Sequence, residues 1–255
     1  MQTPEVIIRE SLNDLASQAA DIIVDAAATA IRDRGRFLFV LSGGKTPENT
    51  YSLLSRSDRA AAVDWSRVFV FLGDERMAPA GDPRSNFGMA QRTLLGRVPI
   101  PAAQIFPVRS EGCSVAEAAA EYQAELLRFF TADPGGAGPR FDLILLGMGE
   151  DGHTASLFPH ARALDVKESW VTWSPPGVLP PPLDRVTLTY PAINAARHVL
   201  FVVAGENKAS PLRDVLEGKA SPAVRPAAGV QPADGTLTWL IDQPAGRLLQ
   251  GTYPK

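Results

Sequence analysis

The sequence predicts an α/β fold in which a doubly wound, mostly parallel sheet is flanked by helices. Continuous apolar runs, each short enough for a buried strand, alternate along the chain with longer segments of helical periodicity. The runs end at glycine or polar residues, where a strand leaves the core. With 255 residues and 45% hydrophobic composition the chain can bury one large core, so we expect a single α/β domain over residues 1–255.

The first helix has the clearest pattern. Residues 11–33 place leucine, isoleucine and alanine on one face, Ser11 opens the segment, and Gly35 ends it. Further helices are expected over residues 47–55, 84–96, 114–131 and 207–217. The first of these begins with Pro47, and proline is favoured in a first turn.

Buried strands are expected over residues 37–41, 68–72, 141–146, 199–203 and 239–241. Strands that alternate with helices need crossover connections, which predicts parallel pairing in a modified Rossmann-like arrangement. Residues 134–139 form a Gly/Pro connector, and the proline-rich residues 175–182 are excluded from a central strand because proline removes ladder donors. We expect a small secondary sheet between residues 171 and 190.

The bulk composition excludes several classes of partner. The net charge is -3 and the pI is about 5.7, so no basic field attracts nucleic acid or an anionic membrane. Cys113 is the only cysteine, which is typical of a reducing compartment and leaves no cysteine-based metal cluster. No apolar run approaches the ~20 residues of a membrane span, and no signal peptide is apparent. We expect a cytoplasmic protein, and the oligomeric state stays open.

The most informative motif lies in residues 143–156, where a predicted strand is followed by two glycines, an acid and a histidine. Parallel sheets place ligands beyond the carboxyl ends of their strands, where Asp151 and His153 would stand. The glycine spacing resembles a nucleotide fingerprint, but no acidic ribose-binding residue follows a second strand about 20 residues later. The segment is therefore interpreted as an active-site turn.

A second strand end carries Ser42, Gly43, Gly44, Lys45 and Thr46. Exposed backbone N–H groups, two hydroxyls and a helix N-terminus suit a phosphate. The Lys-Thr pair is not part of a Walker A loop, because Phe39 occupies the position of its first glycine.

Other strand ends add charged and polar candidates. Asp74 and Arg76 follow the 68–72 strand and could orient a base or stabilise developing negative charge. Ser85 and Asn86 could contact substrate or cap a helix. Arg185 and Lys208 complete the set of predicted ligands, Lys208 being one of only five lysines.

Together these segments resemble the 6-phosphogluconolactonase family. The resemblance rests on residues 41–47, 73–76, 85–86, 147–159, 185–189 and 200–209, so it covers roughly residues 37 to 217 in the family's order. It implies hydrolysis of 6-phospho-D-glucono-1,5-lactone to 6-phosphogluconate, in the oxidative pentose phosphate pathway, without a cofactor. No metal is expected, because one histidine and scattered acids lack a recognisable ligand spacing. The resemblance also implies that Arg185 and Lys208 close over the phosphate held on the 42–46 turn.

The residues suit this reaction, since lactone hydrolysis needs a base, an oxyanion donor and an acid for the leaving oxygen. His153 would be base and then acid, Asp151 or Asp74 would orient it, and Arg76 would stabilise the oxyanion or grip substrate.

Two alternatives are weighed against it. Glucosamine-6-phosphate deaminases resemble the chain in the Ser-Gly-Gly and Asp-Gly-His segments, but have Tyr in place of Arg76 and Glu in place of Phe158. A non-catalytic sugar-phosphate sensor would not need His153.

Overall fold

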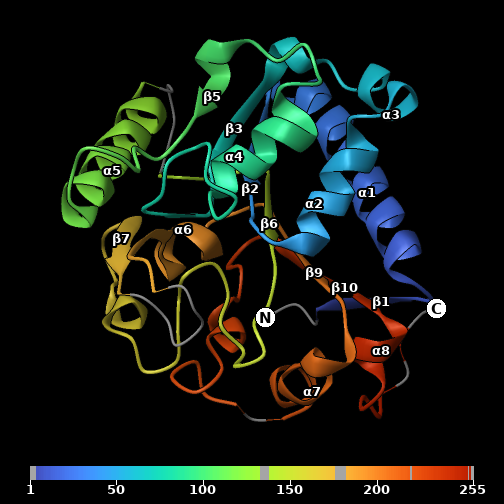
Figure 1. Ribbon diagram of the computed structural model, residues 1–255. Helices are drawn as coiled ribbons and strands as arrows, with labels where there is room; N and C mark the ends of the chain where they lie inside the picture. Colours follow the sequence, from blue (N-terminus) through green and yellow to red (C-terminus); the bar gives the residue numbers. More distant parts are fainter. Residues whose placement is uncertain (1–3, 133–137, 176–181, 219, 252, 254–255) are drawn as a thin grey trace.

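A seven-stranded, all-parallel sheet forms the centre of the computed structural model (Figure 1). The structure describes residues 4–132, 138–175, 182–218, 220–251 and 253. In spatial order the strands are β1 (Glu5–Arg9), β10 (Thr236–Asp242), β9 (His198–Val203), β6 (Leu143–Leu146), β2 (Phe37–Leu41), β3 (Val68–Leu72) and β5 (Ile105–Phe106). The predicted parallel fold is confirmed. β1 and β5 were not predicted, because an edge strand and a two-residue strand carry little apolar pattern.

Helices flank the sheet, with α1 and α2 to the right of the central strands and α5 to their left in Figure 1. They are α1 (Leu12–Arg34), α2 (Lys45–Leu54), α3 (Ser57–Ala61), α4 (Asn86–Ala90), α5 (Val115–Thr131), α6 (Tyr190–Asn194), α7 (Ala209–Leu216) and α8 (Gln243–Gly246). Short 3₁₀ turns lie at Trp65–Arg67, Ala102–Gln104, Arg162–Asp165, Glu206–Lys208 and Pro226–Gly229.

The predicted helix ends agree with the structure where capping residues mark them. Ser11 accepts a hydrogen bond from the backbone of Asp14, and Gly35 has a left-handed φ of 75° after α1. The predicted helix over 84–96 instead divides into α4 and a π-helical turn, Gln91–Leu95. The predicted helix over 207–217 is formed by the 3₁₀ turn Glu206–Lys208 followed by α7.

A second sheet of three antiparallel strands lies beside the first. It has the order β4 (Asp74–Arg76), β8 (Arg185–Leu188) and β7 (Val171–Ser174). The predicted secondary sheet is thus confirmed, but its third strand comes from residues that the sequence placed in a turn after β3. The predicted connector 134–139 and loop 175–182 lie mostly outside the described residues.

Aromatic side chains bind α5 to the parallel sheet. The ring of Phe71 on β3 stacks 4.7 Å from that of Phe106 and meets Phe129 and Phe141 edge-on at 5.2 Å. Phe130 on α5 contacts Phe141 in the same way. Such pairs add to the burial of large apolar surfaces, so this cluster fixes α5 and, through it, the second sheet.

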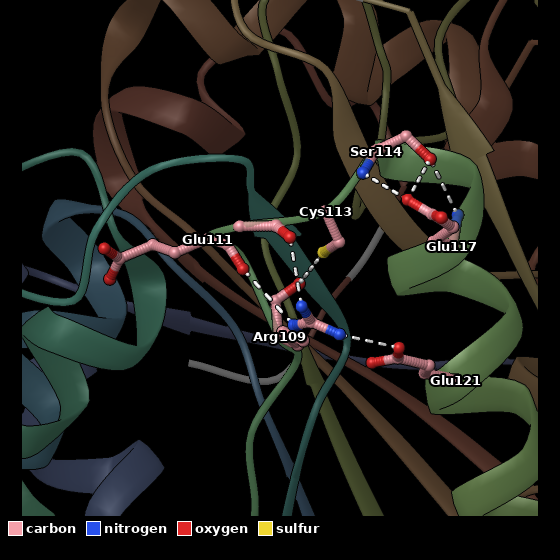
Figure 2. Close-up of polar contacts among 7 residues, drawn as sticks. Arg109, Glu111, Cys113, Ser114, Glu117 and Glu121 are labelled. Carbon is pink, nitrogen blue, oxygen red and sulfur yellow. Dashed lines mark hydrogen bonds and ion pairs between the residues drawn. The ribbon is translucent and has the colours of Figure 1, made fainter.

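The segment that leads into α5 is held by polar contacts (Figure 2). Ser114 and Glu117 form a capping box, and Arg109 lies 2.8 Å from Glu121 on the same helix. The Cys113 thiol points back toward the carbonyl of Arg109. No helix of the described residues is long and apolar enough to cross a membrane.

The strand order reverses at β2, which positions the site. From β2 the chain continues to β3 and β5 on one side, and β6, β9 and β10 lie on the other. The connections that leave β2 and β6 therefore diverge at their carboxyl ends. Parallel sheets of this kind bind ligands in the crevice that such a reversal opens.

Candidate active site

A cavity of about 440 Å³ lies in this crevice, a size that suits a small metabolite. Its walls are the chain segments that follow β2, β6 and β9, together with the second sheet. Most of the residues singled out from the sequence line it, namely Ser42, Gly43, Gly44, Lys45, Thr46, Asp74, Arg76, Asn86, His153, Arg185 and Lys208. Of the predicted set, Asp151 and Ser85 do not line the cavity.

His153 is held by the turn that precedes it. Its backbone N–H donates to Asp151 Oδ1 at 3.0 Å, and its Nδ1 lies 2.6 Å from the same oxygen. Gly149 closes the turn with a backbone hydrogen bond to the carbonyl of His153. A Cβ at Gly149 would overlap the imidazole, so glycine is required for the close approach of the histidine and its carboxylate.

The Asp151 carboxylate is the group that orients the imidazole. Burial disfavours its charged form, but the hydrogen bonds and charge of His153 outweigh burial and lower the pKa of Asp151 to about 2. The carboxylate therefore stays ionised near neutral pH and accepts a hydrogen bond from Nδ1. That arrangement leaves Nε2 of His153 as a hydrogen-bond acceptor.

Asp74, the other candidate for orienting the histidine, serves a different set of partners. It is buried, and its carboxylate accepts hydrogen bonds from Ser156 Oγ at 2.6 Å and Asn86 Nδ2 at 3.2 Å. The backbone N–H of Ser156 in turn donates to Thr187 Oγ1 on β8, at 3.1 Å. Asp74 thus ties the histidine-bearing loop to the second sheet.

Two arginines face one another across that sheet. Arg76 of β4 is paired in register with Arg185 of β8, and opposed residues of antiparallel strands have neighbouring side chains. The Nε atoms of both are buried without a hydrogen-bond partner. Burial, and then the charge of Arg76, lower the pKa of Arg185, although Asp74 acts in the opposite sense. Two guanidinium groups with free donors form a site for an anion.

Phe158 lies between the histidine and one of these arginines. Its ring centroid is 4.7 Å from that of His153, and the guanidinium carbon of Arg185 is 5.2 Å from the ring. The ring thus packs against the imidazole and makes a cation–π contact with the arginine.

The 42–46 turn opens toward the cavity at the start of α2. Gly44 precedes the helix with a φ of 107°, and no side chain caps its N-terminus. The first backbone N–H groups of α2 are therefore available to an anion. A Cβ at Gly43 would overlap the amide oxygen of Asn86, which is buried and has no hydrogen-bond partner.

Lys208 lies on the opposite wall, after β9. Burial lowers its pKa, while the charges of Glu150 and Asp151 act in the opposite sense. The neighbouring Asn207 donates to Glu150 at 2.6 Å, which joins the segments that follow β6 and β9. Glu150 and Asn207 line the cavity but were not predicted; their only sequence signal is that they adjoin Asp151 and Lys208.

Ser85 and Glu75 act behind the cavity. Ser85 caps α4 through the backbone N–H of Gly88 and donates to Glu75 at 3.1 Å, so its hydroxyl is used inside the protein. Glu75 accepts from the backbone N–H groups of Arg76, Asn86 and Phe87. Burial raises its pKa, which these hydrogen bonds counter. Both residues position Arg76 and Asn86.

Comparison with known proteins adds independent evidence. Residues 10–239 match the family model described as glucosamine-6-phosphate isomerases/6-phosphogluconolactonase. A 6-phosphogluconolactonase of Nostoc sp. is 42% identical over 91% of this chain and 92% of its own, and one of Synechocystis sp. is 40% identical over 97% and 99%. The crystal structure of 6-phosphogluconolactonase from Leishmania guyanensis superposes with a TM-score of 0.86 at 30% identity, covering 98% of this chain and 100% of that one.

The sequence segments and the parallel fold agree with these matches, which span nearly the whole chain. The chain therefore belongs to the glucosamine-6-phosphate isomerase/6-phosphogluconolactonase family.

Proposed function

We propose that this protein hydrolyses 6-phospho-D-glucono-1,5-lactone to 6-phospho-D-gluconate, the lactonase step of the oxidative pentose phosphate pathway. One α/β domain over residues 1–255 would carry the reaction. The observation that supports it most directly is an oriented histidine beside paired arginines in one cavity. Among the described residues, four cations line that cavity (Lys45, Arg76, Arg185 and Lys208) against the acids Asp74 and Glu150, although the whole chain is acidic. A phosphorylated, uncharged ring fits this combination.

In this mechanism His153 activates water. Nε2 accepts a proton as the water oxygen attacks the lactone carbonyl, and Asp151 stabilises the imidazolium that forms. The carbonyl oxygen becomes an oxyanion, for which Arg76 supplies donors. When the tetrahedral intermediate collapses, the bond from the carbonyl carbon to the ring oxygen breaks, and His153 returns its proton to that oxygen. No protein nucleophile is needed.

The phosphate would lie on the 42–46 turn, with Lys208 and Arg185 as its charged partners. The uncapped start of α2 and the free Nε of Arg185 support this placement. The partner is therefore a small phosphorylated sugar lactone, and the proposal needs no cofactor or metal.

The two alternatives have less support. A deaminase would need a carboxylate where Phe158 packs against the imidazole, and an apolar ring cannot replace one. A sensor without activity would not need a histidine held at 2.6 Å by a carboxylate.

The direct test is a lactonase assay on freshly generated 6-phosphogluconolactone, corrected for spontaneous hydrolysis. We expect a rate well above buffer. Glucosamine 6-phosphate, supplied in a parallel assay, should release no ammonia. A lactone rate equal to buffer would refute the proposal.

His153→Ala should lower kcat by about 10²- to 10⁴-fold, with little change in KM, because general acid–base catalysis acts in the transition state. Steady-state kinetics on the phosphorylated lactone measure this. His160→Ala and His198→Ala are the matched controls, since neither residue lines the cavity. A His153→Ala enzyme with wild-type kcat would place the base elsewhere.

Arg185→Ala and Lys208→Ala should each raise KM for the phosphorylated lactone by about 10- to 100-fold, the loss expected for one charge-assisted hydrogen bond. Unphosphorylated gluconolactone should be a poor substrate for all variants and should hardly respond to either change. Lys167→Ala, which removes an exposed cation away from the cavity, is the control. Equal losses on both substrates would indicate a structural role.

The lowered pKa of Lys208 predicts a pH dependence of binding. A lysine with a lowered pKa keeps its charge at neutral pH but loses it earlier as pH rises, so affinity for 6-phosphogluconate should begin to fall below the ordinary value of 10.5. Calorimetry measures this without turnover. Lys208→Arg, which stays charged, should remove the fall. Parallel profiles for the two proteins would contradict the prediction.

A further inference from the structure

Tyr51 makes two hydrogen bonds that the proposed chemistry does not use. It is fully buried on α2, its hydroxyl accepts from the backbone N–H of Ser42 at 2.9 Å, and it donates to the carbonyl of Ser42 at 3.0 Å. Burial raises the pKa of Tyr51, so the hydroxyl keeps the proton that it donates. One side chain therefore satisfies both polar groups of a single peptide residue.

Ser42 is the residue at which β2 leaves the sheet. The pairing of β2 with β6 ends at Val40 and Ile144, although β6 continues to Leu146. On the other side of β2, the carbonyl of Leu41 is still bonded to Gly73. Successive residues of a strand direct their polar groups to opposite sides, so those of Ser42 face the β6 side, where no ladder partner remains. The Tyr51 hydroxyl replaces the missing partner.

This replacement is located where the strand order reverses. The segments that line the cavity diverge between β2 and β6. Buried backbone groups left without partners would each cost free energy, so a crevice between two strands needs another source of hydrogen bonds. Here the hydrogen bonds come from Tyr51, which lies about two turns along α2, the helix that begins at the 42–46 turn.

We propose that Tyr51 is a positioning residue, whose hydroxyl fixes the 42–46 turn in the conformation that receives the phosphate. The role of the turn rests on the proposed function, whereas the fixing of its backbone does not. Beyond Ser42, the hydrogen bonds of the turn are a weak contact from Ser42 Oγ to the carbonyl of Gly43, at 3.4 Å, and the first bond of α2, from the N–H of Glu48 to the carbonyl of Gly44. Neither bond joins the turn to the sheet, so its position at the end of β2 depends on the tyrosine.

The neighbouring strand contains a matched control. Tyr122 on α5 is also buried, and its hydroxyl makes the same pair of bonds to Leu72 at the end of β3, 2.9 and 3.1 Å. The next residue after Leu72 is also fixed by backbone hydrogen bonds, because the N–H of Gly73 donates to the carbonyl of Leu41 and the carbonyl of Gly73 accepts from the N–H of Leu188. Removal of the Tyr122 hydroxyl should cost stability without releasing a ligand-binding turn.

The experiment compares Tyr51→Phe with Tyr122→Phe, each of which deletes one hydroxyl. Both should lose similar stability in urea unfolding. Tyr51→Phe alone should bind 6-phosphogluconate about 5- to 30-fold more weakly and raise KM, with kcat nearly unchanged and unphosphorylated gluconolactone little affected. Equal affinity in the two variants would overturn the proposal, because a merely structural hydroxyl would act alike at both strands.

Amide hydrogen exchange provides a readout that needs no substrate. In Tyr51→Phe the Ser42 amide, which donates to the tyrosine hydroxyl, should exchange faster than in Tyr122→Phe, and unchanged protection of this amide overturns the positioning role even in an active lactonase. If wild type lacks lactonase activity, the proposed function fails while the exchange result still decides the role of Tyr51. If Tyr51→Phe does not fold, hydrogen exchange of the wild-type protein still tests the proposal. The Ser42 amide should be as protected from exchange as the Leu72 amide, and free exchange at Ser42 would refute the proposal.

Discussion

The site depends on the way in which parallel strands end together at one edge of a sheet. β2 pairs with β3 on one side and β6 on the other, so the segments that follow all three emerge side by side. Each brings a different chemical function: N–H donors after β2, charged groups after β3, and a histidine after β6. The groups proposed for catalysis and binding are therefore held by the same rigid strands, which are buried among apolar residues.

The second sheet forms one wall of the cavity at these strand ends. Pairing of β4 with β8 places two arginines opposite one another, which would be unfavourable at that register without an anion or a compensating carboxylate. Asp74 lies on the same strand as Arg76, and it also binds Ser156 on the histidine loop. One buried carboxylate thus connects the arginine-bearing sheet to the segment that carries His153.

Much of the remaining structure satisfies buried polar groups around the cavity. Glu75 accepts three backbone N–H groups and a serine hydroxyl, and two tyrosines satisfy the residues at which β2 and β3 leave the sheet. None of these groups needs to touch a substrate. Their common effect is to hold backbone in positions that sheet pairing alone would not maintain, which is how a preorganised site avoids rearrangement when it binds its ligand.

Local signals in the sequence determined the parallel sheet, the cap residues of α1, and the strand-end motifs that contain Asp151, His153 and the 42–46 turn. These features could be predicted because they are marked by apolar runs and glycines that are close together in the chain. Only the tertiary structure decided that Asp151 rather than Asp74 orients the histidine, that residues 74–76 form a strand, and that Ser85 faces inward. It also decided the contacts of Phe158 and Tyr51. These features depend on which segments lie beside one another, and that is fixed by long-range packing rather than by local pattern.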